Sequence, residues 1–280
     1  MTSHQLRVSP KDVGKTLLSF LRDNLQAYPS VKAIKRAIDS KQCKIDGRVE
    51  FFSTFPVSNG SHIEITLGTE KKSFPLTAIF EDEAIIIYNK PPHKASESFK
   101  ELYLVHRLDK ETSGAMILAK TPQAQEAFKV LFEKRKVEKH YLAICDGKPE
   151  KEEWKMENKL MKIASYQGGV IWGAAPKDQG KTALSYFTRL EEGEGASLLL
   201  ARPITGRTHQ IRVHLKGKGH PVLGDWQYAK RFSCSYHPPR VMLHAQFLSF
   251  PHPVTGEQVT VTAPHFPDFI ETRQALFGKK

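Results

Sequence analysis

Apolar positions recur with a helical period near the start of the chain. From Gly14 to Leu25 the leucines are spaced three and four residues apart, which predicts an amphipathic helix. A second helix is expected from Ser30, which can act as its N-cap, to Ser40, with Val31 on its apolar face. Short strands are then expected at 43–45 and 62–65, next to glycine turns at 46–47 and 59–60.

Further along the chain, short apolar runs rich in β-branched residues predict the strands of a larger sheet. A polar stretch at 71–77 is the expected linker between a small α/β unit, residues 1–70, and a large unit, residues 78–280. The elements expected in the large unit are strands at 84–88, 115–119 and 139–144, a helix at 121–135 capped by Thr121, an irregular hairpin within 148–180, and a helix at 210–218 capped by Thr208.

The charge balance favours a polyanionic partner. The chain has 42 Lys and Arg against 30 Asp and Glu, a net charge of +12, and each phosphate that such cations neutralise releases counterions. An anionic membrane surface is the alternative, but no polybasic amphipathic helix stands out, and no run approaches the roughly 18 apolar residues of a membrane span. The three cysteines are scattered, which is typical of a reducing compartment and predicts a cytoplasmic protein.

One face of the second expected helix is basic. Lys32, Lys35 and Arg36 follow at spacings of three and four residues, so their side chains share a face that could contact RNA. The alternative is an ordinary solvated surface.

A charged loop between two apolar runs is the strongest candidate for chemistry. Asp109 follows the run 102–105 and precedes 115–119, which places a carboxylate at the rim of a packed sheet. Its neighbours Arg107 and Lys110 favour the ionised form that a nucleophile or a base requires.

A second polar block contains two arginines at the start of a helix. In the segment 203–214, Gly206 allows a tight turn, and Arg207 and Arg212 lie near the free N–H groups of the first helical turn. This block predicts an anion-favouring site.

The motifs together resemble a known enzyme family. His106-Arg107-Leu108-Asp109 with a following Ser113-Gly114, the pair Lys139 and Tyr141, and the string Thr205 to His214 resemble the motifs of RluA-type pseudouridine synthases. The implied fold is α+β, a mixed and largely antiparallel central sheet with flanking helices. The first 70 residues resemble the small RNA-binding module named after a ribosomal protein of the small subunit.

The resemblance implies a role for each candidate residue. Asp109 would be the catalytic carboxylate, paired with Arg212 or alternatively with Arg207, and Tyr141 would stack on the uracil. Arg107 would fill the space that a flipped nucleotide leaves. The remaining substrate contacts would come from His106, Arg207, Lys32, Lys35 and Arg36.

The resemblance also implies the partners. RNA is the expected substrate, with ribosomal RNA favoured over tRNA because of the N-terminal module. No cofactor and no metal are expected, and the protein is expected to be a monomer.

Two other functions stay open at this point. Only residues 92–105 separate Pro91 from His106, a shorter segment than the family usually has, so the chain could be an RNA-binding ribosome-assembly factor without turnover. A hydrolase of the glycosidic bond would need a second carboxylate, for which Glu111 alone is near.

Overall fold

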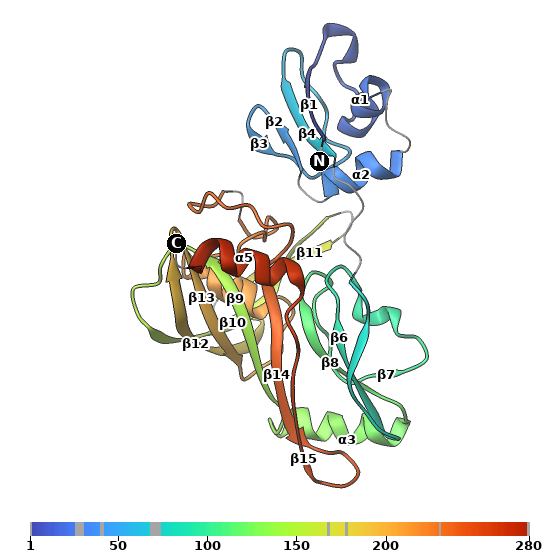
Figure 1. Cartoon of the computed structure of the whole chain (residues 1–280), viewed down its shortest axis with the longest axis vertical. Helices are drawn as coiled ribbons and strands as arrows, with labels where there is room; N and C mark the ends of the chain where they lie inside the picture. Colours follow the sequence, from blue (N-terminus) through green and yellow to red (C-terminus); the bar gives the residue numbers. More distant parts are fainter. Residues whose placement is uncertain are drawn as a thin grey trace. The chain divides into compact units, whose positions relative to one another are not determined.

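A computed structural model describes residues 2–25, 31–39, 42–67, 74–166, 169–176, 179–229 and 231–278. The chain forms two compact units, Met1–Ser73 and Phe74–Lys280 (Figure 1). No helix in these ranges is both long and apolar enough to cross a membrane.

The first unit combines helices with an antiparallel sheet. Its described strands follow the order β1-β4-β2-β3. The elements are β1 (Thr2–Arg7), η1 (Pro10–Asp12), α1 (Leu17–Asn24), α2 (Val31–Asp39), β2 (Cys43–Ile45), β3 (Arg48–Val49) and β4 (His62–Leu67).

Local chemistry sets the ends of the helices in this unit. Helix α1 begins at Leu17 and not at Gly14, because the Thr16 hydroxyl accepts the Ser19 N–H at 3.2 Å and caps the helix there. The apolar face of α2 starts one turn later than predicted: Val31 is exposed, whereas Ile34 and Ile38 are buried. The predicted cap, Ser30, lies outside the described residues. Strand β1 was not predicted because its residues are mostly polar.

The second unit is built on one large sheet. Its described strands follow the order β11-β10-β12-β13-β9-β14-β8-β6-β5, and β15 and β7 add to β14 and β8. Among these strands β14 and β8 are parallel and the other pairs are antiparallel, which confirms the predicted α+β class. The strands are β5 (Thr77–Glu81), β6 (Ile85–Lys90), β7 (Tyr103–Leu104), β8 (Ser113–Ala119), β9 (Glu138–Asp146), β10 (Glu153–Tyr166), β11 (Gly169–Ala174), β12 (Lys181–Gly193), β13 (Ala196–Pro203), β14 (Leu243–Pro251) and β15 (Gln258–Thr262).

Helices cover parts of this sheet. The helices are η2 (Ser96–Ser98), α3 (Pro122–Glu133), α4 (Gln210–Gly217) and α5 (Pro267–Phe277). Helix α3 contacts β7 and β8, α5 contacts β12, and α4 contacts β11, β12 and β13. The predicted start of α3 is confirmed, because the Thr121 hydroxyl accepts the Ala124 N–H at 3.1 Å. The predicted cap of α4 is wrong: His209, with a left-handed backbone, occupies the N-cap position in place of Thr208.

The segment expected to be an irregular hairpin contains two paired strands, β10 and β11, with one register shift between Lys162 and Ala164. Strand β10 alternates between exposed and half-buried residues over 153–159, as a strand does when one face is covered. The polar composition that suggested a loop therefore belongs to its solvent face.

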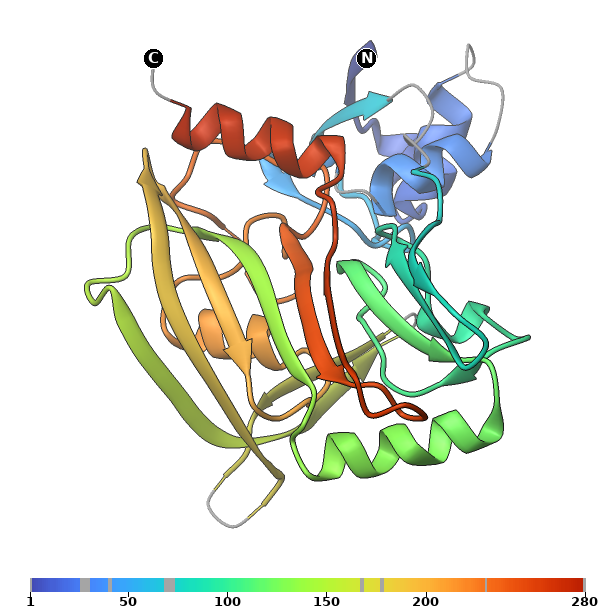
Figure 2. The same cartoon turned by 60° about the horizontal axis from the view of Figure 1, so that its bottom comes forward.

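Three neighbouring strands at the centre of the sheet bring the sequence motifs together. Tyr141 of β9 is opposite Ala245 of β14, and Ala245 is opposite Gly114 of β8. Figure 2 shows β14, in orange, between these two green strands. Gly114 has φ +112°, and a Cβ there would lie 2.2 Å from the Ala245 carbonyl oxygen. Glycine is therefore required for β8 and β14 to approach each other, just after the Asp109 loop.

Candidate active site

The loop that carries Asp109 is fixed on both sides of the carboxylate. The buried Leu108 packs against an apolar cluster with Met116 and Ala245. Its backbone N–H donates to the Ser96 hydroxyl at 3.1 Å, and that hydroxyl donates to the Leu108 carbonyl at 2.8 Å. The loop thus has both backbone groups next to Asp109 satisfied.

Two further residues hold the ends of this loop. His106 Nε2 accepts the Ile117 N–H at 2.8 Å, so Nδ1 carries the proton of the neutral ring. Burial, with a contribution from the cation of Lys139, lowers the pKa of His106 to about 3. The buried Lys90 Nζ donates to backbone carbonyls, among them that of Lys110 at 3.4 Å.

A buried network of charges surrounds Asp109. Arg212 is 3% exposed, and its Nη1 lies 3.2 Å from Asp109 Oδ2. Its Nε and Nη2 donate to both carboxylate oxygens of Asp225 at 2.6 and 2.8 Å, and Nη2 also donates to Gln227 at 2.7 Å. Burial opposes the charge of Arg212, but the two carboxylates outweigh it and raise its pKa above the usual value. The guanidinium is therefore a permanent cation with a fixed orientation.

Gln210 attaches the turn before α4 to strand β12. Its side-chain oxygen accepts the Thr205 hydroxyl at 2.6 Å and the Arg207 N–H at 3.0 Å. Its amide nitrogen donates to the Leu184 carbonyl at 3.0 Å and the Ser185 hydroxyl at 2.8 Å. This buried side chain helps to fix the orientation of α4, and so of Arg212, together with the core packing of Ile211 and Leu215.

A histidine also faces Asp109. The Trp172 N–H donates to the Tyr228 hydroxyl at 3.0 Å, which leaves the hydroxyl proton to be donated to His209 Nδ1 at 2.7 Å. His209 Nε2, which then carries the ring proton, lies 3.9 Å from Asp109 Oδ2. Burial lowers the pKa of His209, which favours the neutral ring.

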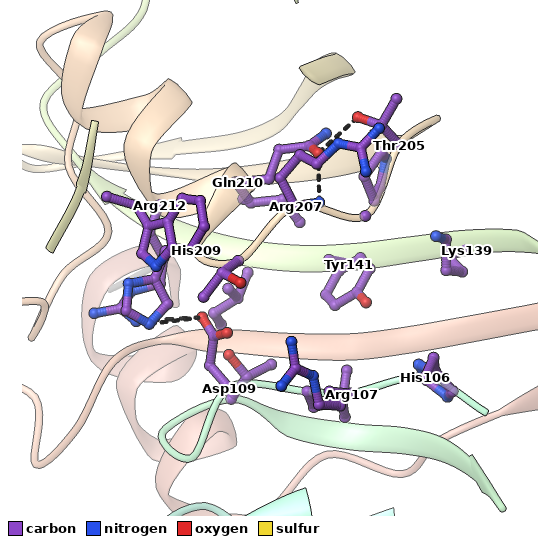
Figure 3. Close-up of a pocket in the computed structure, with 18 of the residues that line it drawn as sticks. His106, Arg107, Asp109, Lys139, Tyr141, Thr205, Arg207, His209, Gln210 and Arg212 are labelled. Atoms are coloured by element: carbon purple, nitrogen blue, oxygen red, sulfur yellow. Dashed lines mark hydrogen bonds and ion pairs between the residues drawn. The ribbon is translucent and has the colours of Figure 1, made fainter. Parts of the chain in front are cut away.

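Asp109, His209 and Arg212 line one end of a cavity of about 1020 Å³ (Figure 3). Tyr141 lies along the middle of its wall, and Lys139 and His106 lie toward the other end (Figure 3). Burial and, to a smaller extent, Asp109 raise the pKa of Tyr141, so its hydroxyl stays protonated. The arrangement can hold a flat, uncharged ring next to a carboxylate.

The other predicted substrate-binding residues do not contact Asp109 in the described structure. Arg207 lines the cavity, but its Nε donates to the Thr182 carbonyl at 3.0 Å, and Arg212 is the arginine that reaches Asp109. Arg107 is exposed and lies 3.6 Å from Glu97. In the first unit Lys35 is exposed, and the side chains of Lys32 and Arg36 lie outside the described residues.

Several residues of this site were not predicted as site residues. They are Asp225, Gln227, Tyr228, His209 and Gln210. A signal existed for three of them, because His209 and Gln210 belong to the block that contains Arg212, and Asp225 ends the string 219–225, which also resembles the family. No pattern in the sequence connects Gln227 or Tyr228 to Asp109.

Comparisons with known proteins place this chain in one class. A model of the RNA pseudouridylate synthase family matches residues 85–216. Ribosomal large subunit pseudouridine synthase D of Haemophilus influenzae is 30% identical over 96% of this chain and 93% of its own length. Ribosomal large subunit pseudouridine synthase C of Vibrio vulnificus is 28% identical over 90% of this chain and 89% of its own length.

A solved structure agrees with these matches. Human RNA pseudouridylate synthase domain containing 1 superimposes with a TM-score of 0.61 at 27% identity, over 72% of this chain and 89% of the human chain. The protein is thus an RNA pseudouridine synthase, an isomerase. Within that class, it belongs to the RluA family.

Proposed function

We propose that this synthase converts uridines of large-subunit ribosomal RNA to pseudouridine, with Asp109 as the catalytic carboxylate. The ion pair of Asp109 with Arg212, in a cavity walled by Tyr141, is the observation that carries the proposal. The net charge of +12 suits a large folded RNA. Relatives that cover most of the chain are named as large-subunit enzymes, which favours ribosomal RNA over tRNA.

The reaction needs few groups. The bond between ribose carbon 1′ and uracil nitrogen 1 breaks, and a bond from carbon 1′ to uracil carbon 5 forms. Carbon 5 loses a proton and nitrogen 1 gains one, so the atoms balance without an oxidant. In this proposal Asp109 attacks the uracil ring, attacks ribose carbon 1′, or acts as a general base that abstracts a proton. Arg212 pairs with the Asp109 carboxylate and orients it, and Tyr141 stacks on the uracil.

The surface residues would handle the RNA chain. Arg107 is close enough to Glu97 for only a weak, exposed ion pair, so it can leave that partner and enter the space of the flipped nucleotide. Lys32, Lys35 and Arg36 of the first unit would contact RNA phosphates. A cytoplasmic, monomeric enzyme that needs no metal or cofactor remains the prediction.

Tritium release from RNA labelled at carbon 5 of uracil tests the proposal. Wild-type protein is expected to release tritium from a large-subunit ribosomal transcript and not from tRNA, and Asp109→Asn is expected to release none. Equal release by Asp109→Asn would overturn the role of Asp109. Release from tRNA alone would overturn the substrate and leave the chemistry in place.

A further inference from the structure

Lys139 carries a charge that nothing in the described protein neutralises. It lies on β9, lines the cavity, and forms no ion pair with any acidic side chain of the described ranges. Burial lowers the pKa of Lys139 to about 8, and no carboxylate counters that effect. The buried arginines Arg212 and Arg240 do have such partners, for example Arg240 with Asp268 at 2.7 Å.

The described residues around Lys139 partly bury its ammonium group but offer it no negatively charged partner. Its Nζ lies 5.5 Å from the centre of the Phe132 ring. The neutral ring of His106 lies 5.6 Å from the same phenyl ring. On the other side is the turn at Gly206, where a Cβ would stand 3.8 Å from Nζ and meet no closer atom. An anion therefore has room to approach the ammonium group from the cavity.

The position of Lys139 relative to Tyr141 suggests which anion this is. The two residues are separated by one position on the same strand, so they point to the same face about 7 Å apart. Figure 3 shows Tyr141 between Lys139 and the Asp109 end of the cavity. A uracil stacked on Tyr141 would have its own ribose and phosphate within reach of such a span.

We propose that Lys139 binds the phosphate group attached to the target uridine. Its ammonium forms a phosphate subsite in a cavity that Arg135 also lines. This inference rests on the proposed placement of the uracil between Tyr141 and Asp109. Glu133 also lines the cavity but forms no ion pair with Lys139 in the described structure, so a phosphate would supply the counter-charge of this ammonium. A charge-assisted contact gains strength in a partly desolvated site. A second base would leave the ammonium without a counter-charge.

Small ligands test the subsite without knowledge of the RNA target. The probes are uridine, uridine 3′-monophosphate and uridine 5′-monophosphate, titrated into the full-length protein and followed by NMR. Wild type is expected to bind one of the two monophosphates about tenfold more tightly than uridine. Lys139→Gln is expected to lose that advantage and to bind uridine as wild type does, whereas Lys139→Arg keeps part of it.

A matched control removes the same charge elsewhere. Lys218 is exposed at the end of α4, and Lys218→Gln is expected to keep the full preference for the monophosphate. Thermal unfolding of each variant shows whether it is folded. An equal preference in wild type and Lys139→Gln, or no preference in wild type, would overturn the proposal.

A second readout separates this inference from the proposed reaction. In an Asp109→Asn background, which is expected to bind RNA without turnover, Lys139→Gln should make the negative slope of log affinity against log salt shallower by about 0.7 to 0.9. An unchanged slope would contradict the subsite. If tritium release fails while both binding results hold, the proposed reaction is wrong and the phosphate subsite stands.

Discussion

The two ends of the cavity treat buried charge in opposite ways. At one end Arg212 has hydrogen bonds to Asp225, Gln227 and Asp109, so its charge is matched inside the protein. At the other end Lys139 has an aromatic ring nearby and no acidic partner within the described ranges. The end around Arg212, which we call the matched end, has its charges paired before RNA binds. At the end around Lys139, which we call the unmatched end, the counter-charge comes from the ligand.

The choice of cation fits this division. The planar guanidinium of Arg212 can bind a carboxylate with two nitrogens and still reach a second one, which a lysine cannot do. The ammonium of Lys139 changes its pKa readily on burial and suits a single approaching anion. The fixed orientation of Arg212 and the unpaired charge of Lys139 thus follow from the chemistry of the two side chains.

The largest effect is expected when the matched end loses its counter-charge. Asp225→Asn leaves Arg212 buried with one carboxylate, and we expect the free energy of unfolding to fall by about 3 kcal/mol. Tritium release should fall with it, because Arg212 no longer has a fixed orientation. Urea unfolding measures the first effect. Glu157→Gln, which removes an exposed partner of Lys155, is the control. Its free energy of unfolding should fall by less than about 1 kcal/mol. Equal losses in the two variants would contradict the comparison.

A glycine substitution tests the strand junction beneath the matched end. Gly114→Ala would place a Cβ 2.2 Å from the Ala245 carbonyl oxygen at φ +112°, so β8 and β14 must separate. We expect a loss of about 2 to 3 kcal/mol in unfolding free energy, with loss of tritium release. Gly256→Ala shares a positive φ, with no atom within 4 Å of the new Cβ, and should cost about 1 kcal/mol. Similar values for both would show that close approach is not the cause.

A smaller effect is expected from the hydroxyl that orients His209. Tyr228→Phe removes the donor to His209 Nδ1 and frees the ring to change tautomer. We expect kcat/KM for tritium release to fall about tenfold while RNA affinity changes little. Tyr186→Phe, at an exposed position, should leave kcat/KM unchanged. A full rate in Tyr228→Phe would show that the tautomer of His209 has no influence.

The smallest effect is a pH dependence at the unmatched end. The pKa of Lys139 is lowered to about 8 in the folded protein from 10.5, so the ammonium is lost as the pH rises through that value. Affinity for a uridine monophosphate should therefore fall between pH 7 and 9 in wild type and less in Lys139→Gln. For stability the sign is opposite: the unfolded chain binds the extra proton between about 8 and 10.5, so the free-energy cost of burying this lysine falls as the pH rises through that range. Parallel affinity curves for the two proteins would contradict the assignment.

The sequence predicted the motifs of the site better than their connections. Asp109 and Arg212 could be singled out because each belongs to a distinctive string, and the structure brings them within 3.2 Å. The choice between Arg207 and Arg212 needed the backbone, since it depends on the side on which α4 leaves its first turn. The prediction of Thr208 as the N-cap of α4 was wrong for a similar reason, because His209 adopts a left-handed conformation that no local pattern indicates.

Other parts were hidden by their surroundings. Strand β10 reads as a polar loop because one of its faces is open to solvent. Strand β1 was not predicted because its residues are mostly polar, although its backbone pairs with β4. The partnership of Asp225 with Arg212 depends on a tertiary contact within the second unit. Sequence patterns report local periodicity, and such contacts leave no periodic signal.

The position of β14 has a consequence for the order in which the protein folds. This strand is made late in synthesis, yet it lies between β9 and β8, which are both completed much earlier along the chain. Until residues 243–251 arrive, each earlier strand has an open edge that can pair with the wrong partner. Tyr141 and the Asp109 loop lie on opposite sides of that gap. The cavity therefore closes only when a long-range pairing, slow to form, joins the two halves of the sheet.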